Sequence, residues 1–86
     1  MFGLPTMFAV GKLRFMAFSN DFDEPPHVHA IHGNSSGASV AKFWLNPIKL
    51  NKNRGYNRAE LRRIQSIIEE QHDFLMEQWN AFKARR

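Results

Sequence analysis

An uninterrupted helical pattern fills the last third of the chain and limits what the remainder can form. Residues 58–84 contain neither Gly nor Pro. Large apolar side chains recur there at helical spacing, at Leu61, Ile64, Ile68, Leu75, Trp79 and Phe82. Asn57, followed three residues later by Glu60, has the spacing of a capping box. The pattern therefore predicts one long C-terminal helix over residues 58–84.

The length of this helix sets a geometric problem. A continuous helix over these residues would be about 40 Å long, whereas a six-residue strand covers only about 20 Å. The helix must therefore overhang the sheet or break, and the polar step Gln71-His72-Asp73 is where we expect a kink. An overhanging end would expose Trp79 and Phe82 to a partner, including a second copy of the chain. Alternatively, both aromatic side chains complete the core.

The first half has the composition of β-structure. Short apolar runs bounded by turn residues predict strands, at 6–10, 13–18, 27–32 and 38–45, with one more short strand at 48–50 and a turn at 51–55. The 86 residues support a single domain, β-rich over 6–50 and helical over 58–84. We expect an α+β fold in which the helix packs on one face of a four- or five-stranded, mostly antiparallel sheet.

Charge and composition narrow the possible partners. The net charge is +4 and there is no Cys, which excludes disulfides and cysteine metal sites. No signal peptide or membrane span is readable, so we expect a cytoplasmic protein without a membrane partner. Seven basic residues against one acid, Glu60, lie between Lys42 and Arg63. Such a stretch is typical of proteins that bind RNA, DNA or an acidic protein, although a solvated surface has the same composition.

The segment Glu24-Pro25-Pro26-His27-Val28-His29 carries the clearest chemistry. On a strand, His27 and His29 project to the same face. Two imidazoles and Glu24 could act as general acid and base in RNA cleavage, with a nearby Arg for the phosphate. A further alternative is that the two imidazoles hold a divalent metal, for which no third ligand is certain. The remaining interpretation is structural, with the histidines hydrogen-bonded to the loop carboxylates.

A second set of residues suggests nucleic-acid or partner binding. Phe43 and Trp44 point to opposite faces of their strand, so one can fill the core while the other lies on the open face, where an exposed aromatic beside Lys42 could stack on a base. Alternatively, a terminus, a loop or a partner protein covers this tryptophan. The candidate binding residues are Lys42, Trp44, Arg54, Arg58, Arg62 and Arg63.

Several segments occur in an order that resembles domain-of-unknown-function family 4160, a group of small bacterial proteins. They are Phe18-Ser19-Asn20-Asp21, Glu24 to His29, Lys42-Phe43-Trp44-Leu45, Asn53-Arg54-Gly55, Glu60-Leu61-Arg62-Arg63-Ile64 and Trp79. The resemblance implies no established activity. It implies a gene pair with another small protein, which resembles a toxin–antitoxin arrangement. The turn at 33–37 departs from the family because it is rich in Ser and Gly.

Three functions follow as hypotheses. The first is the toxin of such a pair, a ribonuclease that uses the His-x-His site. The second is a non-enzymatic antitoxin or regulatory module that binds a small cognate protein, and DNA, through the helix and the basic stretch. The third is a metal-binding protein. A compact basic chain without a disordered arm favours the toxin.

Overall fold

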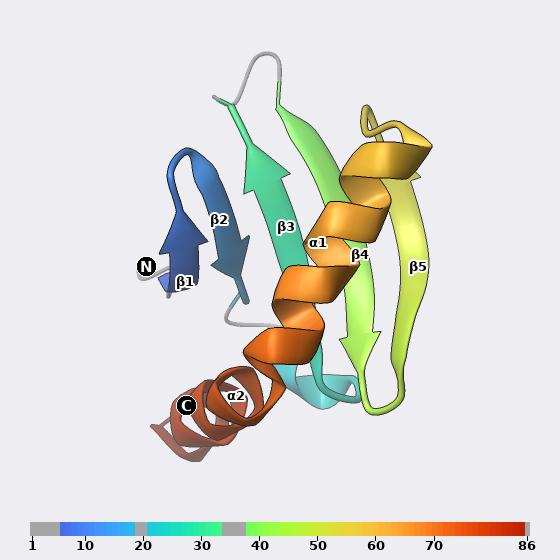
Figure 1. Cartoon of the computed structure of the whole chain (residues 1–86). Helices are drawn as coiled ribbons and strands as arrows, with labels where there is room; N and C mark the ends of the chain where they lie inside the picture. Colours follow the sequence, from blue (N-terminus) through green and yellow to red (C-terminus); the bar gives the residue numbers. More distant parts are fainter. Residues whose placement is uncertain (1–5, 19–20, 34–37, 86) are drawn as a thin grey trace.

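The computed structural model describes residues 6–18, 21–33 and 38–85. Five strands form one antiparallel sheet in the order β1-β2-β3-β4-β5, so each strand pairs with its neighbour in sequence (Figure 1). The strands are β1 (Thr6–Val10), β2 (Leu13–Met16), β3 (His27–His32), β4 (Ser39–Leu45) and β5 (Ile48–Arg54). The short 3-10 helix η1 (Asp21–Asp23) precedes β3. The α+β class and the antiparallel sheet are confirmed.

The C-terminal segment forms two helices, so the prediction of one long helix needs correction. Helix α1 (Arg58–Glu70) crosses one face of the sheet, and α2 (His72–Arg85) turns away at the end where β3 begins (Figure 1). The break falls at Gln71, within the predicted kink. Its physical reason is length, because a straight helix would have run far beyond a sheet of this size.

Contacts at both ends of the break fix the direction of α2. The Gln71 N–H still donates to the Ile67 carbonyl at 2.9 Å, which closes α1. The His72 Nε2–H donates to the carbonyl of Leu45, the last residue of β4, at 2.6 Å. The bend therefore ties the start of α2 to the sheet and lets its apolar side chains reach the core.

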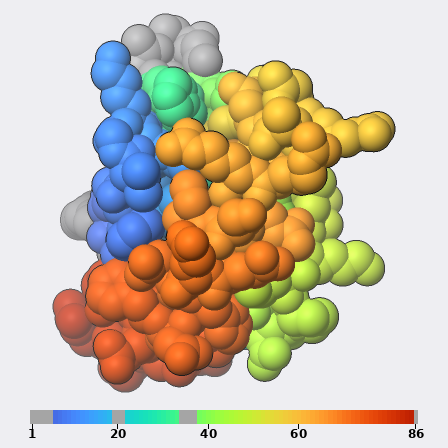
Figure 2. All heavy atoms as spheres, in the orientation of Figure 1, coloured from blue at the N-terminus to red at the C-terminus, as the bar shows by residue number. Residues whose placement is uncertain are grey.

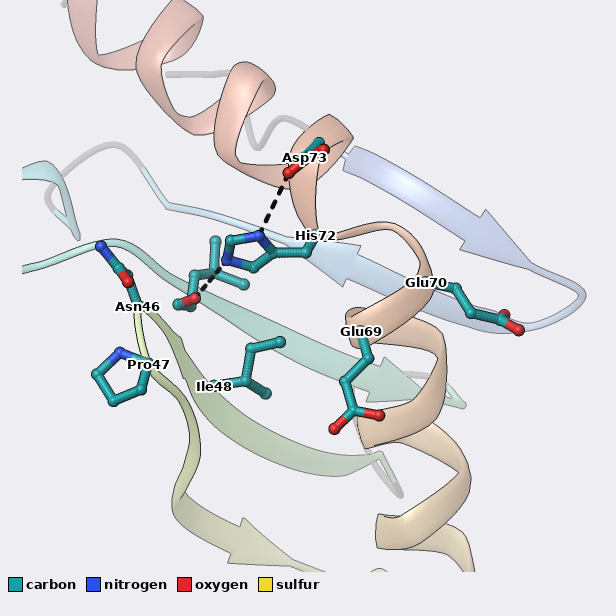
Figure 3. Close-up of a pocket in the computed structure, with 8 residues that line it drawn as sticks. Asn46, Pro47, Ile48, Glu69, Glu70, His72 and Asp73 are labelled. Carbon is teal, nitrogen blue, oxygen red and sulfur yellow. Dashed lines mark hydrogen bonds and ion pairs between the residues drawn. The ribbon is translucent and has the colours of Figure 1, made fainter.

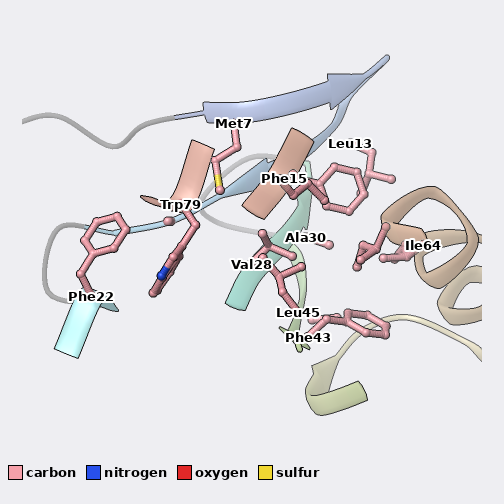
Figure 4. Packing of buried hydrophobic residues seen from close by; sticks show 14 residues of the cluster. Met7, Leu13, Phe15, Phe22, Val28, Ala30, Phe43, Leu45, Ile64 and Trp79 are labelled. Atoms are coloured by element: carbon pink, nitrogen blue, oxygen red, sulfur yellow. The ribbon is translucent and has the colours of Figure 1, made fainter. Parts of the chain in front are cut away.

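The core lies between α1 and the sheet and continues under α2. Alternation along the strands directs Phe15, Val28 and Phe43 toward α1, where they meet Ile64 and Ile68, all of them buried. Trp79 of α2 is also buried, with its ring centroid 4.4 Å from that of Phe22 (Figure 4). Trp79 thus completes the core, and Phe82 packs against the cluster partly buried.

The last strand is longer than the sequence predicts. A turn was expected at 51–55, but β5 continues through Arg54, which pairs with Val40. A register shift opposite Lys42 and Phe43 lets the asparagine-rich segment stay in the ladder. The turn follows at Gly55, whose φ of 95° is costly for other residues. There the Asn53 side chain bonds both the N–H and the carbonyl of Tyr56.

The sheet face opposite α1 is called the open face below. Strand alternation and the pairings His29 with Lys42, Lys42 with Lys52, and Val40 with Arg54 bring the side chains of three strands together there. The side chains directed to this side are those of Arg14, Met16, His27, His29, Ile31, Val40, Lys42, Trp44, Lys49, Lys52 and Arg54, of which Met16 and His27 are buried. None of these residues is acidic. The strands that follow one another in sequence therefore gather basic side chains on a single surface.

Candidate functional site

His27, the first residue of β3, is fully buried. Its Nδ1–H donates to the Pro25 carbonyl at 2.8 Å, because a carbonyl oxygen can only accept. Its ring lies 5.0 Å from that of Trp79 and 5.6 Å from that of Trp44, between centroids. The histidine therefore joins the Pro25 loop, β4 and α2, and a substrate has no access to it in this conformation.

His29 shares the face of His27, as predicted, with ring centroids 5.2 Å apart. It is half-buried, and the Phe18 ring meets its ring edge-on at 4.8 Å. The Lys42 ammonium, on the residue paired with His29, forms an ion pair with the Glu24 carboxylate at 2.6 Å. Of the predicted catalytic residues, His29 and Glu24 are thus accessible on the open face, whereas His27 lies beneath it.

Trp44 and Lys42 lie on the same face of β4, two residues apart. The Lys42 Nζ stands 4.7 Å from the centroid of the Trp44 ring, which is a cation–π contact. Trp44 is half-buried, with His27 packed behind it. Phe43, on the opposite face, is fully buried. The sequence prediction that these two aromatic side chains divide between core and open face is confirmed.

A basic groove crosses the open face between β4 and β5. It has a volume of about 420 Å³ and is lined by His29, Val40, Lys42, Lys52, Asn53 and Arg54. The structure thus unites two of the predicted binding residues, Lys42 and Arg54, and adds Lys52, which the sequence indicates only as a member of the basic stretch. Its position opposite Lys42 on the next strand is the signal that could have found it, once the hairpin register was known.

The other predicted cations lie in a different layer. Arg58, Arg62 and Arg63 are exposed on α1, on the side of the sheet opposite the basic groove. The basic stretch of the sequence therefore divides into two surfaces. Only its β4–β5 half borders Trp44.

Arg63 borders a small cavity on the α1 side. This cavity, of about 140 Å³, is lined by Leu13, His32, Ser39, Tyr56, Glu60, Arg63 and Ile64. The Tyr56 hydroxyl donates to the Ala30 carbonyl at 2.9 Å. Burial, and secondly the Glu60 carboxylate, raise the pKa of Tyr56 from 10.0 to about 12. The phenol is thus a fixed hydrogen-bond donor at neutral pH rather than a proton-transfer group.

A second cavity, of about 480 Å³, lies at the helix break. Figure 3 shows the His72 ring between the Leu45 carbonyl and the Asp73 carboxylate, whose nearest oxygen is 3.6 Å from Nδ1. Glu69 and Glu70 give this opening a negative rim, opposite in charge to the basic groove. Within the described residues, no group of three or more His, Asp or Glu side chains is placed to hold a metal ion.

None of the helices that the structure describes is long and apolar enough to cross a membrane. In comparisons with known proteins, a family model described as "Domain of unknown function (DUF4160)" matches residues 12–80. This range runs from the turn before β2 into α2 and includes the whole open face except β1. No curated protein and no solved structure matches the chain.

Proposed function

The chain belongs to the DUF4160 family, whose description assigns no activity, and from that premise we propose that it binds single-stranded RNA on its open face. The observation that carries the proposal is the basic groove, which Lys42, Lys52 and Arg54 line together, with the Lys42 ammonium also in contact with the Trp44 ring. Cations on a sheet surface neutralise phosphates, and an adjacent aromatic ring stacks on a base. Both parts are present on one face.

Binding has more support than cleavage. RNA cleavage by a two-histidine mechanism needs both imidazoles at the reacting atoms. His27 is buried and already donates through Nδ1 to Pro25, which leaves His29 as the accessible imidazole. The ribonuclease role of His27, His29 and Glu24 stays a prediction, as does the toxin–antitoxin-like pairing with a small cognate protein.

Glu24 has a defined effect in a binding site. Its carboxylate holds Lys42, so a phosphate must compete with it for the same ammonium group. The Glu24 side chain is 47% exposed and that of Lys42 is 15% exposed, so the carboxylate can move into solvent and leave the ammonium group to a phosphate. Glu24→Gln is therefore expected to tighten RNA binding by a few-fold, whereas the same change in a catalytic acid would lower cleavage.

The test is a titration of fluorescein-labelled single-stranded RNA, followed by fluorescence anisotropy at several salt concentrations. The double substitution Lys52→Glu/Arg54→Glu is compared with Arg62→Glu/Arg63→Glu on α1, which changes the net charge equally. We expect the first to weaken binding at least 10-fold and to flatten the salt dependence by about 0.7 for each phosphate that is no longer neutralised. Trp44→Leu should cost about 1–3 kcal/mol, roughly 5- to 150-fold, if one base stacks there.

Two outcomes would contradict the proposal. Equal losses in both double variants would show that only net charge attracts the RNA. If the wild-type protein does not bind the RNA even at low salt, the RNA-binding proposal is wrong. Gel analysis of the same samples, with His29→Ala as a control, separates binding from cleavage. Circular dichroism confirms that each variant is folded.

A further inference from the structure

The two edges of the sheet differ in chemistry. β1 and β5 are the edge strands. In an antiparallel edge strand, every second residue turns both its backbone N–H and its C=O away from the sheet, which makes the edge a template for another strand. Within the described residues, no strand pairs with the outer side of β1 or of β5.

β5 carries charges that oppose such pairing, whereas β1 carries none and is protected only by its shortness and by a register shift between Thr6 and Phe8. Lys49, Lys52 and Arg54 place three cations along β5, and charge on an edge strand opposes further pairing. By contrast, β1 reads Thr-Met-Phe-Ala-Val, without charge or proline. Val10 at its end is 37% exposed. Figure 2 shows the β1–β2 hairpin, in blue, along one rim of the molecule, beside the helices.

An apolar side chain of α2 extends this edge. Phe74 is 40% exposed, the highest value among the large apolar side chains that the structure describes. Its ring centroid lies 6.2 Å from that of Phe8 in β1, in an edge-on contact. The strand therefore has exposed apolar surface next to its available backbone groups, as an interface requires and a solvated edge does not.

We propose that β1 pairs with β1 of a second copy, antiparallel about a two-fold axis, to form one continuous sheet across both copies. A two-fold contact is self-complementary, so one uncharged edge supplies both halves of the interface. This dimer differs from one that uses the Trp79 end of the C-terminal helix, because Trp79 is in the core.

Electrostatic repulsion between two copies of this basic protein is smaller when they join at β1 than when they join at β5. Strands are spaced about 4.8 Å apart, so the two β4 strands of such a dimer lie roughly 34 Å from each other. The nearest basic strands, the two β2 strands with Arg14, lie about 14 Å apart, which still exceeds the Debye length of about 8 Å at physiological salt. Joining at β5 would instead bring Lys52 and Arg54 of two copies to adjacent strands.

The symmetry has a geometric consequence. Antiparallel pairing within one sheet requires a two-fold axis perpendicular to the sheet, so both α1 helices lie on one side and both open faces on the other. The dimer itself does not depend on RNA binding. If both proposals hold, the two basic grooves form the ends of one extended surface.

Ala9 offers a direct test. Its side chain is exposed, so a charged side chain there stays in solvent. Glu would face its partner Arg14 in β2 favourably, whereas Lys would add a like charge opposite Arg14 and weaken the β1–β2 pairing. Ala9→Lys and Ala9→Glu, measured separately by sedimentation equilibrium, should be monomeric at concentrations where the wild type is dimeric. Mixing the two variants should restore the dimer, because opposite charges then meet across the two-fold axis.

Leu50→Lys is the control on β5, the edge opposite β1. It should leave the dimer intact because β5 is outside the proposed interface. Leu50 is as exposed as Val10 at the end of β1, so the two edges are compared at similar exposure. Circular dichroism establishes that each variant is folded. A wild type that stays monomeric at the highest concentration overturns the proposal. So does a mixture of the Ala9 variants that stays monomeric, or a Leu50→Lys variant that dissociates while the Ala9 variants remain dimeric.

Discussion

At the scale of single residues, the Glu24–His29 segment contains a buried histidine that stabilises the fold and two residues that are accessible on the open face. His27 is held by Pro25, Trp44 and Trp79, whereas His29 and Glu24 reach the open face. The shared face of the two histidines follows from strand alternation and could be predicted from the sequence. The burial of His27 could not, because it depends on Trp79, a residue far along the chain whose approach requires the break before α2.

The burial of His27 leads to a stability prediction. His27→Ala removes a buried ring and the hydrogen bond to Pro25, and should lower the free energy of unfolding by about 2–4 kcal/mol. His32→Ala, at an exposed position of the same strand, should cost less than about 1 kcal/mol. Urea unfolding followed by circular dichroism measures both. If His27→Ala is as stable as the wild type but abolishes an RNA cleavage activity, the histidine is catalytic and our structural interpretation is wrong.

The raised pKa of Tyr56 predicts how stability changes at high pH. Because Tyr56 is the only tyrosine in the chain, the tyrosinate absorbance reports its ionisation alone. The fold raises its pKa to about 12, so folding favours the protonated phenol. The stability it contributes is complete below pH 10 and is lost as the pH rises from 10 toward 12. The ultraviolet absorbance of tyrosinate should show a midpoint near 12 in the native protein and near 10 in urea. A native midpoint at the ordinary tyrosine value, with unchanged circular dichroism, would contradict the assignment.

At the scale of elements, the helix start was the easiest feature to predict and the end of β5 the hardest. The capping box is local, so four residues suffice to indicate it. The extent of β5 depends on its pairing with β4 and on the register shift there, which outweigh the turn preference of the asparagines. The break at Gln71 could be predicted because the helix length and the strand length were both readable.

The capping box itself can be tested. The Asn57 side chain accepts from the Glu60 N–H at 2.8 Å, and the Glu60 carboxylate accepts from the Asn57 N–H at 2.8 Å. Asn57→Ala should therefore lower the free energy of unfolding by about 1 kcal/mol, measured by urea titration. Ser66→Ala, at an exposed position within α1, controls for helix propensity and should not destabilise the protein. Equal effects of the two changes would argue against the cap.

At the scale of the whole molecule, the sequence indicates the amount of basic charge but not its distribution. Lys42, Lys52 and Arg54 come together because two antiparallel strands alternate in register, whereas Arg62 and Arg63 follow a helix in the other layer. A linear run of charge cannot reveal that division. The α+β class, by contrast, follows from periodicity alone, because a chain of this length has one sheet and one helical segment to pack together.

The meander order of the sheet also bears on how the chain assembles. Every strand pairs with the next one in sequence, so no pairing closes a loop longer than the connection between Met16 and His27, and the entropic cost of closure is modest. The packing of α2 against β1, by contrast, joins the two ends of the chain. A sheet in which each strand pairs with its neighbour in sequence has mostly local contacts, and such topologies fold quickly for their content of β-structure. The contact of α2 with β1 has the largest sequence separation in the fold, and its formation therefore has the largest loop-closure cost.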